Sequence, residues 1–301
     1  MNLTQDVAVA VECLKQGIPV AFPTETVYGL GANVFNPEAV EAVFKMKGRP
    51  SDNPLICHIS DLNQLEILAR EIPQEAYLLA SHFWPGPLTL ILKKQPQVPT
   101  IVTGGLDSVA VRMPRHPLAL ELIRRAGEPL VGPSANQSGR PSSTDPSHVL
   151  SDFTGMTGVV LDGGVCKEGI ESTVLYLAGE KPLLLRPGMI GLQQIENVLK
   201  CQIEIRTGSH ASPGTRYKHY APNAKVHIFD SFEKVPVSSR KRFYMSTDEH
   251  PGFHLLTTHT LYGLLRRADS ESAEEVIIVC SALEHPALRN RLFRAAGLTV
   301  L

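Results

Sequence analysis

Lys47 and Arg49 are two cations that follow a predicted helix, and small polar side chains surround them in the sequence. Before them, an apolar run at 18–22 predicts a buried strand, and the loop after it contains Thr26. After them, a second apolar strand carries His58. Cations and small polar groups that leave the ends of neighbouring elements together commonly form an anion site. This stretch therefore predicts anion binding.

Each of these features also has an ordinary structural explanation. A Thr-Glu-Thr turn often only ends a strand, and Lys-Gly-Arg after a helix commonly satisfies the last carbonyl groups. A single histidine between Cys57 and Ile59 is more often a hydrogen-bonded core residue than a ligand. The anion-site hypothesis is favoured because a matching set of residues follows later in the chain.

Arg112 interrupts an apolar strand predicted at 109–113. It needs an anionic partner, because burying an unpaired charge is prohibitive. Two partners fit the sequence equally well. One is an acidic side chain in a structural ion pair, and the other is a ligand carboxylate held by two parallel hydrogen bonds.

A second transition from strand to polar loop follows at 129–139, where Ser134 and Asn136 present a hydroxyl and an amide. Ser134 could be a plain cap and Asn136 a plain turn residue. A strand at 183–185 then leads to Arg186. The chain thus offers several separate groups that could meet around one anion.

One helix in the first part of the chain is clearly marked. Asn36 is a good N-cap, Pro37 fits the first helical position, and Gly48 ends the helix. A helix beginning at Thr4 or Asp6 is also predicted. A helical stretch is expected from 61 past Pro73 to 83, and an irregular loop at 96–107.

The order of elements predicts an α/β protein. Strands and helices alternate irregularly over residues 1–200, which indicates a mixed, twisted sheet with helices on its faces. Residues 201–224 are basic and rich in turn formers and tyrosines, as in a linker or a lid over an anionic ligand. Residues 225–301 predict a smaller, doubly wound Rossmann-like α/β domain. That domain has no Gly-x-Gly-x-x-Gly after its first strand, so no cofactor is assigned to it.

The composition is that of an ordinary globular protein. The 301 residues are 43% hydrophobic and 20% charged, with a net charge of -1, which argues against a whole-surface attraction to nucleic acid. Five scattered cysteines without a Cys-x-x-Cys pair support neither a disulfide framework nor a zinc site, so a reducing cytoplasm is expected. No signal peptide and no apolar run of 18 residues is found.

Several common catalytic motifs are absent from the sequence. There is no Gly-x-x-x-x-Gly-Lys-Ser/Thr loop, no Gly-x-Ser-x-Gly elbow and no His-Glu-x-x-His. A phosphate site here must therefore use side-chain cations and loop amides.

The motifs together resemble one known family, the L-threonylcarbamoyladenylate synthases in their two-domain form, with a YrdC-like catalytic domain before a smaller C-terminal domain. The resemblance covers essentially the first 225 residues, in order. The stretches that carry it are PTETVYGLGAN, KGRPSDNPLICHI, VAVRMP, PSANQSG, GIESTV, LRPGMI and SPGTRYKHYAP.

This resemblance implies an enzyme, a nucleotidyltransferase that joins ATP, L-threonine and bicarbonate (or carbon dioxide) into threonylcarbamoyl-AMP and pyrophosphate. The product serves N6-threonylcarbamoylation of adenosine 37 in tRNA, by a downstream tRNA-modifying complex. Mg²⁺ would accompany ATP, because carboxylate ligands for a protein-held metal are scarce in these motifs. The nucleophile is the substrate's own carbamate oxygen, so catalysis rests on positioning and charge stabilisation.

The same resemblance implies a role for individual residues. The paired signature that would carry catalysis is Lys47, Arg49, Ser134 and Asn136. The residues implied to hold ATP are Lys47, Arg49, Asn53, Ser108, Ser134, Ser142, Arg186, Tyr217 and His219, with Lys218 closing beside the last two. Those implied to hold threonine are Thr26, His58, Arg112, Gly132 and Ser172. No metal ligand is implied.

Two other functions compete with this one. A non-enzymatic RNA- or tRNA-binding module of YrdC-like fold would use the same cations along a phosphate backbone, but the 6% aromatic content offers few stacking platforms. The carbamoyl-transfer domain of hydrogenase maturation proteins is related, but those larger chains carry zinc-finger cysteine spacings that this sequence lacks.

Overall fold

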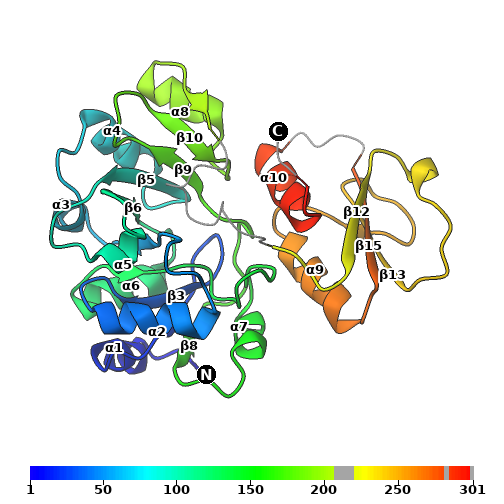
Figure 1. The fold of residues 1–301 in the computed structure, drawn as a ribbon, viewed down its shortest axis with the longest axis horizontal. Coiled ribbons are helices and arrows are strands. Elements are labelled where there is room, and N and C mark those ends of the chain that lie inside the picture. The colour runs from blue at the N-terminus through cyan, green and yellow to red at the C-terminus, as the bar shows by residue number, and fades with distance from the viewer. Residues whose placement is uncertain (207–219, 281–284, 299–301) are drawn as a thin grey trace.

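The chain folds into two units, each built around its own sheet (Figure 1). The computed structural model describes residues 1–206, 220–280 and 285–298. Over these ranges the larger sheet has 11 strands and the smaller one has 4.

The larger sheet is mixed, as the sequence predicts. Parallel pairs such as β4–β6 and β5–β9 alternate with antiparallel pairs such as β2–β3 and β5–β6. Its strands, in spatial order, are β1 (Asn2–Thr4), β8 (Val159–Leu161), β2 (Val20–Phe22), β3 (Gly29–Asn33), β7 (Leu130–Val131), β4 (Ile56–His58), β6 (Ser108–Arg112), β5 (Leu88–Lys93), β9 (Thr173–Tyr176), β10 (Leu183–Arg186) and β11 (Glu204–Ile205).

Helices cover both faces of this sheet. On one face α1 (Val7–Lys15) and α6 (Pro117–Ala126) share a core cluster with Val20 and Phe22 of β2. Ala21, which lies between them and points the other way, belongs to the larger cluster on the opposite face. The helices that contribute to that larger cluster are α2 (Pro37–Lys47), α3 (Asn63–Leu68), α4 (Gln74–Phe83), α5 (Thr100–Thr103), α7 (Pro146–Asp152) and α8 (Leu192–Leu199).

The helix α2 has the ends that its sequence predicts. The Asn36 side chain accepts a hydrogen bond from the Ala39 amide at 3.0 Å, and Gly48 ends the helix in the left-handed conformation with φ at +59°. The helix therefore ends at Lys47, and Arg49 follows directly after the Gly48 cap. The amino-terminal helix is also confirmed, with Asp6 as its N-cap.

Two local predictions are wrong. The helical stretch expected from 61 to 83 is broken into α3 and α4, because Ala69 pairs with Lys94 and the Arg70 amide donates to the Lys93 carbonyl. Pro73 then starts α4 as its N-cap. The loop expected at 96–107 contains the short helix α5.

The smaller sheet is wholly parallel, in agreement with the predicted Rossmann-like unit. Its spatial order is β12 (Lys225–Phe229), β15 (Glu275–Val279), β13 (Arg242–Ser246) and β14 (His254–Leu255), with a 3-10 turn at Phe232–Lys234. The helices α9 (Leu261–Ser270) and α10 (Pro286–Ala295) lie between this sheet and the larger unit (Figure 1).

The two units share a core at their contact. Val27 and Ile170 of the first unit belong to the same apolar cluster as Leu261, Tyr262 and Leu292 of the second. The strand β11 lies within the stretch predicted as linker, and the domain boundaries at 200 and 224 stay a prediction. Within the described ranges, no helix has the length and apolar character to cross a membrane.

Candidate active site

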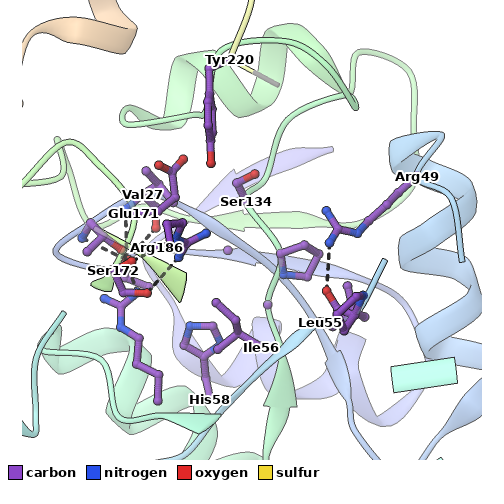
Figure 2. Close-up of a pocket in the computed structure, with 17 residues that line it drawn as sticks. Val27, Arg49, Leu55, Ile56, His58, Ser134, Glu171, Ser172, Arg186 and Tyr220 are labelled. Carbon is purple, nitrogen blue, oxygen red and sulfur yellow. Dashed lines mark hydrogen bonds between the residues drawn. The ribbon is translucent and has the colours of Figure 1, made fainter. Parts of the chain in front are cut away.

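One pocket gathers residues from six segments of the first unit, together with Tyr220 (Figure 2). It holds about 570 Å³ of empty space, part of which is open solvent. Arg49 lies on one side, while Glu171, Ser172 and Arg186 gather on the other (Figure 2). The residues that line it are Thr24, Thr26, Val27, Gly29, Arg49, Pro54, Leu55, Ile56, His58, Arg112, Gly132, Pro133, Ser134, Glu171, Ser172, Arg186 and Tyr220.

The structure brings the predicted threonine residues together. All five implied residues (Thr26, His58, Arg112, Gly132 and Ser172) line the pocket. The sheet explains two of them, because β4 and β6 are parallel neighbours and His58 is in register with Arg112. Which ligand these residues hold stays a prediction.

Arg112 is buried and has an acidic partner. Its Nη2 atom lies 2.8 Å from Oε1 of Glu25, and both side chains are less than 5% exposed. Its Nη1 donates to the Thr26 hydroxyl at 2.9 Å, and its Nε donates to the Gly86 carbonyl at 3.2 Å. The structural ion pair is therefore present. A guanidinium has five N–H groups, so two remain that could contact a ligand in the pocket.

His58 is a neutral group in the wall of the pocket. Burial, together with the neighbouring Arg112 cation, lowers the pKa of His58 to about 3. Its ring packs edge-on against Phe22, with the ring centroids 5.4 Å apart. Among the described residues its buried Nδ1 has no hydrogen-bond partner of good geometry, although a backbone hydrogen bond with Ile56 offsets part of the lowering of its pKa. Such an atom is suited to a polar group of a ligand.

Gly132 leaves room for this histidine. A Cβ atom at position 132 would lie 2.7 Å from Nδ1 of His58 and 2.8 Å from Cζ of Phe22. Both rings are buried and cannot move aside without disturbing the core. Position 132 therefore requires glycine.

Lys47 connects the end of α2 to the loop after β7. Its Nζ donates to the carbonyl oxygen of Ser134 and, at 2.5 Å, to that of Asn136. Burial and the nearby Arg49 cation lower the pKa of Lys47 well below its ordinary value. The Lys-x-Arg and Ser-x-Asn segments thus meet, but Lys47 contacts the loop backbone and does not line the pocket.

Arg49 and Arg186 are the pocket's other two guanidinium groups among the described residues. Arg49 Nη2 donates to the Pro54 carbonyl at 2.9 Å. Arg186 Nε and Nη2 donate to the carbonyl and hydroxyl oxygens of Ser172 at 3.0 and 3.1 Å. Both side chains are held by backbone or hydroxyl oxygens and keep their positive charge facing the pocket.

Some predicted ATP residues lie beside the pocket or away from it. Asn53 and Ser142 are buried near it but do not line it, and the same holds for Asn136, which was predicted as a catalytic residue. Asn136 donates its amide to the Gln137 and Arg140 carbonyls, which orders the loop. Ser108 begins β6 opposite Lys93, four residues before Arg112, and is not in the pocket. Tyr217, Lys218 and His219 lie outside the described residues.

The pocket-lining or adjacent residues that the sequence does not predict as part of the site include Glu25, Glu171 and Tyr220. The sequence indicates that Arg112 needs an anionic partner. It does not indicate which of the 30 acidic residues is that partner. Glu171 and Tyr220 contact side chains of the C-terminal unit, and no local pattern reveals such a contact.

The donor set does not form a metal site of its own. Within the described ranges no group of three or more His, Cys, Asp or Glu side chains could hold an ion. Glu25 faces Arg112, and Glu171 faces Arg291. Carboxylates occupied by cations in this way are poor ligands for Mg²⁺.

Comparison with known proteins gives a family for both units. Residues 12–188 match the Sua5/YciO/YrdC family model, which carries the description "Telomere recombination". Residues 190–297 match the model described as "Threonylcarbamoyl-AMP synthase, C-terminal domain".

Individual relatives agree with these matches. The threonylcarbamoyl-AMP synthase of Bacillus subtilis is 42% identical over 326 residues, with 97% of this chain and 93% of the relative covered. That of Pyrococcus abyssi is 50% identical over 231 residues, with 74% and 68% covered. A crystal structure of P. abyssi Sua5 complexed with L-threonine has a TM-score of 0.89 at 39% identity, and covers 100% of this chain and 98% of that one. The chain therefore belongs to the Sua5/YciO/YrdC family, in the form that carries the threonylcarbamoyl-AMP synthase C-terminal domain.

Proposed function

We propose that this protein is a threonylcarbamoyl-AMP synthase, which converts ATP, L-threonine and bicarbonate into threonylcarbamoyl-AMP and pyrophosphate. One observation carries the proposal: three guanidinium groups and a neutral histidine, from segments far apart in the sequence, line a single pocket. The relatives in B. subtilis and P. abyssi bear the name of this activity, and the P. abyssi structure contains L-threonine.

Two sets of pocket residues suit different parts of the substrates, and the two arginines of the second set lie on opposite sides of the pocket (Figure 2). Arg112, Thr26 and His58 offer two guanidinium N–H groups, a hydroxyl and an imidazole nitrogen, which match the carboxylate and polar groups of an amino acid. Arg49 and Arg186, with Ser134 between them in the lining, suit the negative charge of a triphosphate. Threonine is therefore assigned to the first set of residues and ATP to the second.

The chemistry is an adenylyl transfer, which would make the enzyme a nucleotidyltransferase. The amine of threonine forms a bond to the carbon of bicarbonate, with loss of water, or to that of carbon dioxide, with loss of a proton. A carbamate oxygen then attacks the α-phosphorus of ATP. As the new oxygen–phosphorus bond forms, the bond from the α-phosphorus to the bridging oxygen breaks, and pyrophosphate leaves with the electron pair.

The protein's part in this reaction is to position and to stabilise charge. Lys47 holds the Ser134 loop against the end of α2, and Arg186 is fixed by Ser172. Fixed cations of this kind stabilise the charge that develops during phosphoryl transfer without reorganisation. His58 is neutral, so the positive charge of the pocket comes from the arginines and not from this histidine.

Mg²⁺ is proposed to arrive with ATP and to neutralise part of the triphosphate charge. The pocket's own carboxylate within the described ranges, Glu171, is already bound by Arg291 and Tyr262. The phosphate oxygens and water would therefore supply the ligands of the ion.

The product is a reactive mixed anhydride, so a second enzyme must consume it. We propose that a tRNA-modifying complex transfers the threonylcarbamoyl group to adenosine 37. Direct tRNA binding is not needed for the adenylyl transfer.

The proposal is tested by incubating the protein with ATP, Mg²⁺, bicarbonate and L-threonine and measuring pyrophosphate. Release that requires both bicarbonate and threonine, and that is much slower with serine or glycine, is expected. Equal release without threonine would refute the proposed function, and RNA binding without any release would favour the non-enzymatic alternative.

A further inference from the structure

Glu171 lines the pocket, but most of the donors to its carboxylate come from the C-terminal unit. Oε1 accepts a hydrogen bond from the Ser142 hydroxyl at 2.6 Å. Tyr262 of α9 donates to Oε2 at 2.8 Å, and Arg291 of α10 donates its Nε to the same oxygen, also at 2.8 Å. Figure 2 shows Glu171 beside Ser172 and Arg186.

Arg291 binds both segments that carry this wall of the pocket. Its side chain is fully buried. Beyond the carboxylate, Nη2 donates to the backbone carbonyl of Glu171 at 3.2 Å, and Nη1 donates to that of Pro187 at 2.9 Å. Glu171 precedes Ser172 and Pro187 follows Arg186, so one guanidinium from α10 fixes the backbone next to both residues.

The charges explain why this contact matters for an anionic ligand. Burial raises the pKa of Glu171, but Arg291 and Arg186 outweigh burial and hold it below its ordinary value, so the carboxylate is ionised at neutral pH. An ionised carboxylate in the pocket repels a triphosphate and attracts Arg186. Arg291 is a counter-ion of Glu171 in addition to Arg186, so it offsets negative charge at this wall of the pocket.

We propose that Arg291 is a positioning residue of the ATP site, which neutralises Glu171 and fixes the wall that carries Arg186 and Ser172. The C-terminal unit thereby supports the wall of the active site through Arg291, without contacting the substrates. This inference rests on the proposed function for the identity of its anion, ATP.

The test is a double-mutant cycle read by equilibrium binding of ATP and of threonine. Arg291→Met leaves Glu171 as an unpaired anion, and ATP binding is expected to weaken about tenfold or more, with a smaller change for threonine. Glu171→Gln in the same chain removes that anion. The double variant is expected to bind ATP within about threefold of Glu171→Gln alone.

Arg266 provides a matched control from the neighbouring helix α9. It is also a buried arginine, and it pairs with the buried Asp152, which does not line the pocket. Its Nε also donates to the Ser142 carbonyl at 3.4 Å, so it contacts the segment next to Glu171 but not the carboxylate itself. Arg266→Met is expected to destabilise the fold as Arg291→Met does. Any loss of ATP binding by Arg266→Met should not be restored when Glu171→Gln is added to it. Arg291→Lys keeps the cation and should bind ATP more tightly than Arg291→Met.

The outcomes separate this proposal from a merely structural role. ATP binding by Arg291→Met within about threefold of the wild type, or a double variant no better than Arg291→Met, would overturn it. If Arg291→Met does not fold, Tyr262→Phe removes a neutral donor from the same carboxylate, and about threefold weaker ATP binding that Glu171→Gln relieves is expected. Unchanged binding there would equally overturn the proposal. A wild-type protein that binds ATP but releases no pyrophosphate would count against the proposed function alone.

Discussion

The Nζ atom of Lys47 lies 2.5 Å from the carbonyl oxygen of Asn136, although 89 positions separate the two residues in the chain. The Ser138 amide returns the contact by donating to the Lys47 carbonyl at 2.9 Å. These bonds join the end of α2 to the loop that carries Ser134. Arg49 and Ser134 therefore keep fixed positions on the pocket wall.

Replacing Lys47 with methionine should damage both the fold and the site. The change leaves buried carbonyl oxygens without their donor, and the free energy of unfolding is expected to fall by about 2–3 kcal/mol. Lys45→Met is the control, because that side chain is 73% exposed and pairs only with Glu41 across one helical turn. Its effect should be within about 0.5 kcal/mol. Urea denaturation measures both, and equal losses would show that the Lys47 contacts contribute nothing specific.

The Arg112–Glu25 pair allows stability to be separated from ligand binding. Removing either partner leaves an unpaired buried charge, so Arg112→Gln or Glu25→Gln alone should cost about 3–5 kcal/mol of unfolding free energy. The double variant should recover most of this loss. Its threonine affinity should nevertheless stay reduced by about tenfold or more, because the bidentate donor is gone.

Calorimetry with threonine and with ATP on the same samples checks this prediction. ATP binding by the double variant should be close to that of the wild type. Equal loss of ATP and threonine binding would show that Arg112 does not belong to the threonine side.

Two glycines should respond in opposite ways to alanine. Gly132→Ala places a Cβ atom 2.7 Å from His58, and the resulting overpacking should cost about 1–3 kcal/mol and reduce threonine binding. Gly263 lies in α9, where an added Cβ atom would meet nothing within 4 Å and φ is ordinary, so Gly263→Ala should stabilise the protein by about 0.5–1 kcal/mol. Thermal denaturation of both variants decides this, and a neutral Gly132→Ala would contradict the close packing around His58.

The buried His58 should make stability depend on pH. Its folded-state pKa of about 3 is below the ordinary value of 6.5, so in this window the unfolded chain binds the extra proton. Its contribution is therefore complete above pH 6.5 and is lost as the pH falls toward 3, with a slope of at most about 1.4 kcal/mol per pH unit. Wild type and His58→Gln should be compared by urea denaturation between pH 6.5 and 4. Parallel curves would show that His58 is protonated in the folded state.

The parts of the fold that could be predicted from sequence are those with local signals. Asn36, Pro37 and Gly48 mark the ends of α2 wherever the helix packs, so the position of Lys47 and Arg49 followed from the sequence. The separate strand-to-loop segments could be identified in the same way. The structure brings residues of these segments together in one pocket, and the ligand of that pocket stays a prediction.

The features that could not be predicted depend on partners far away in the chain. The break between α3 and α4 arises because Ala69 pairs with Lys94, and nothing near Ala69 signals that pairing. Arg112 pairs with Glu25, and Arg291 pairs with Glu171, because the packing of whole elements brings these side chains together. The sequence therefore identifies the charged residues of the site but not the groups that neutralise their charge.

The most direct test of the central claim follows two labels into one product. The protein is incubated with L-threonine, carbon-14 bicarbonate and ATP labelled with phosphorus-32 at the α-phosphate, and the nucleotide products are separated. Adenylyl transfer to a carbamate predicts a single threonine-dependent product that carries both labels in equal amounts, with pyrophosphate formed alongside it. Carbon-14 and phosphorus-32 in separate products, or label transferred from the γ-phosphate instead, would contradict the account.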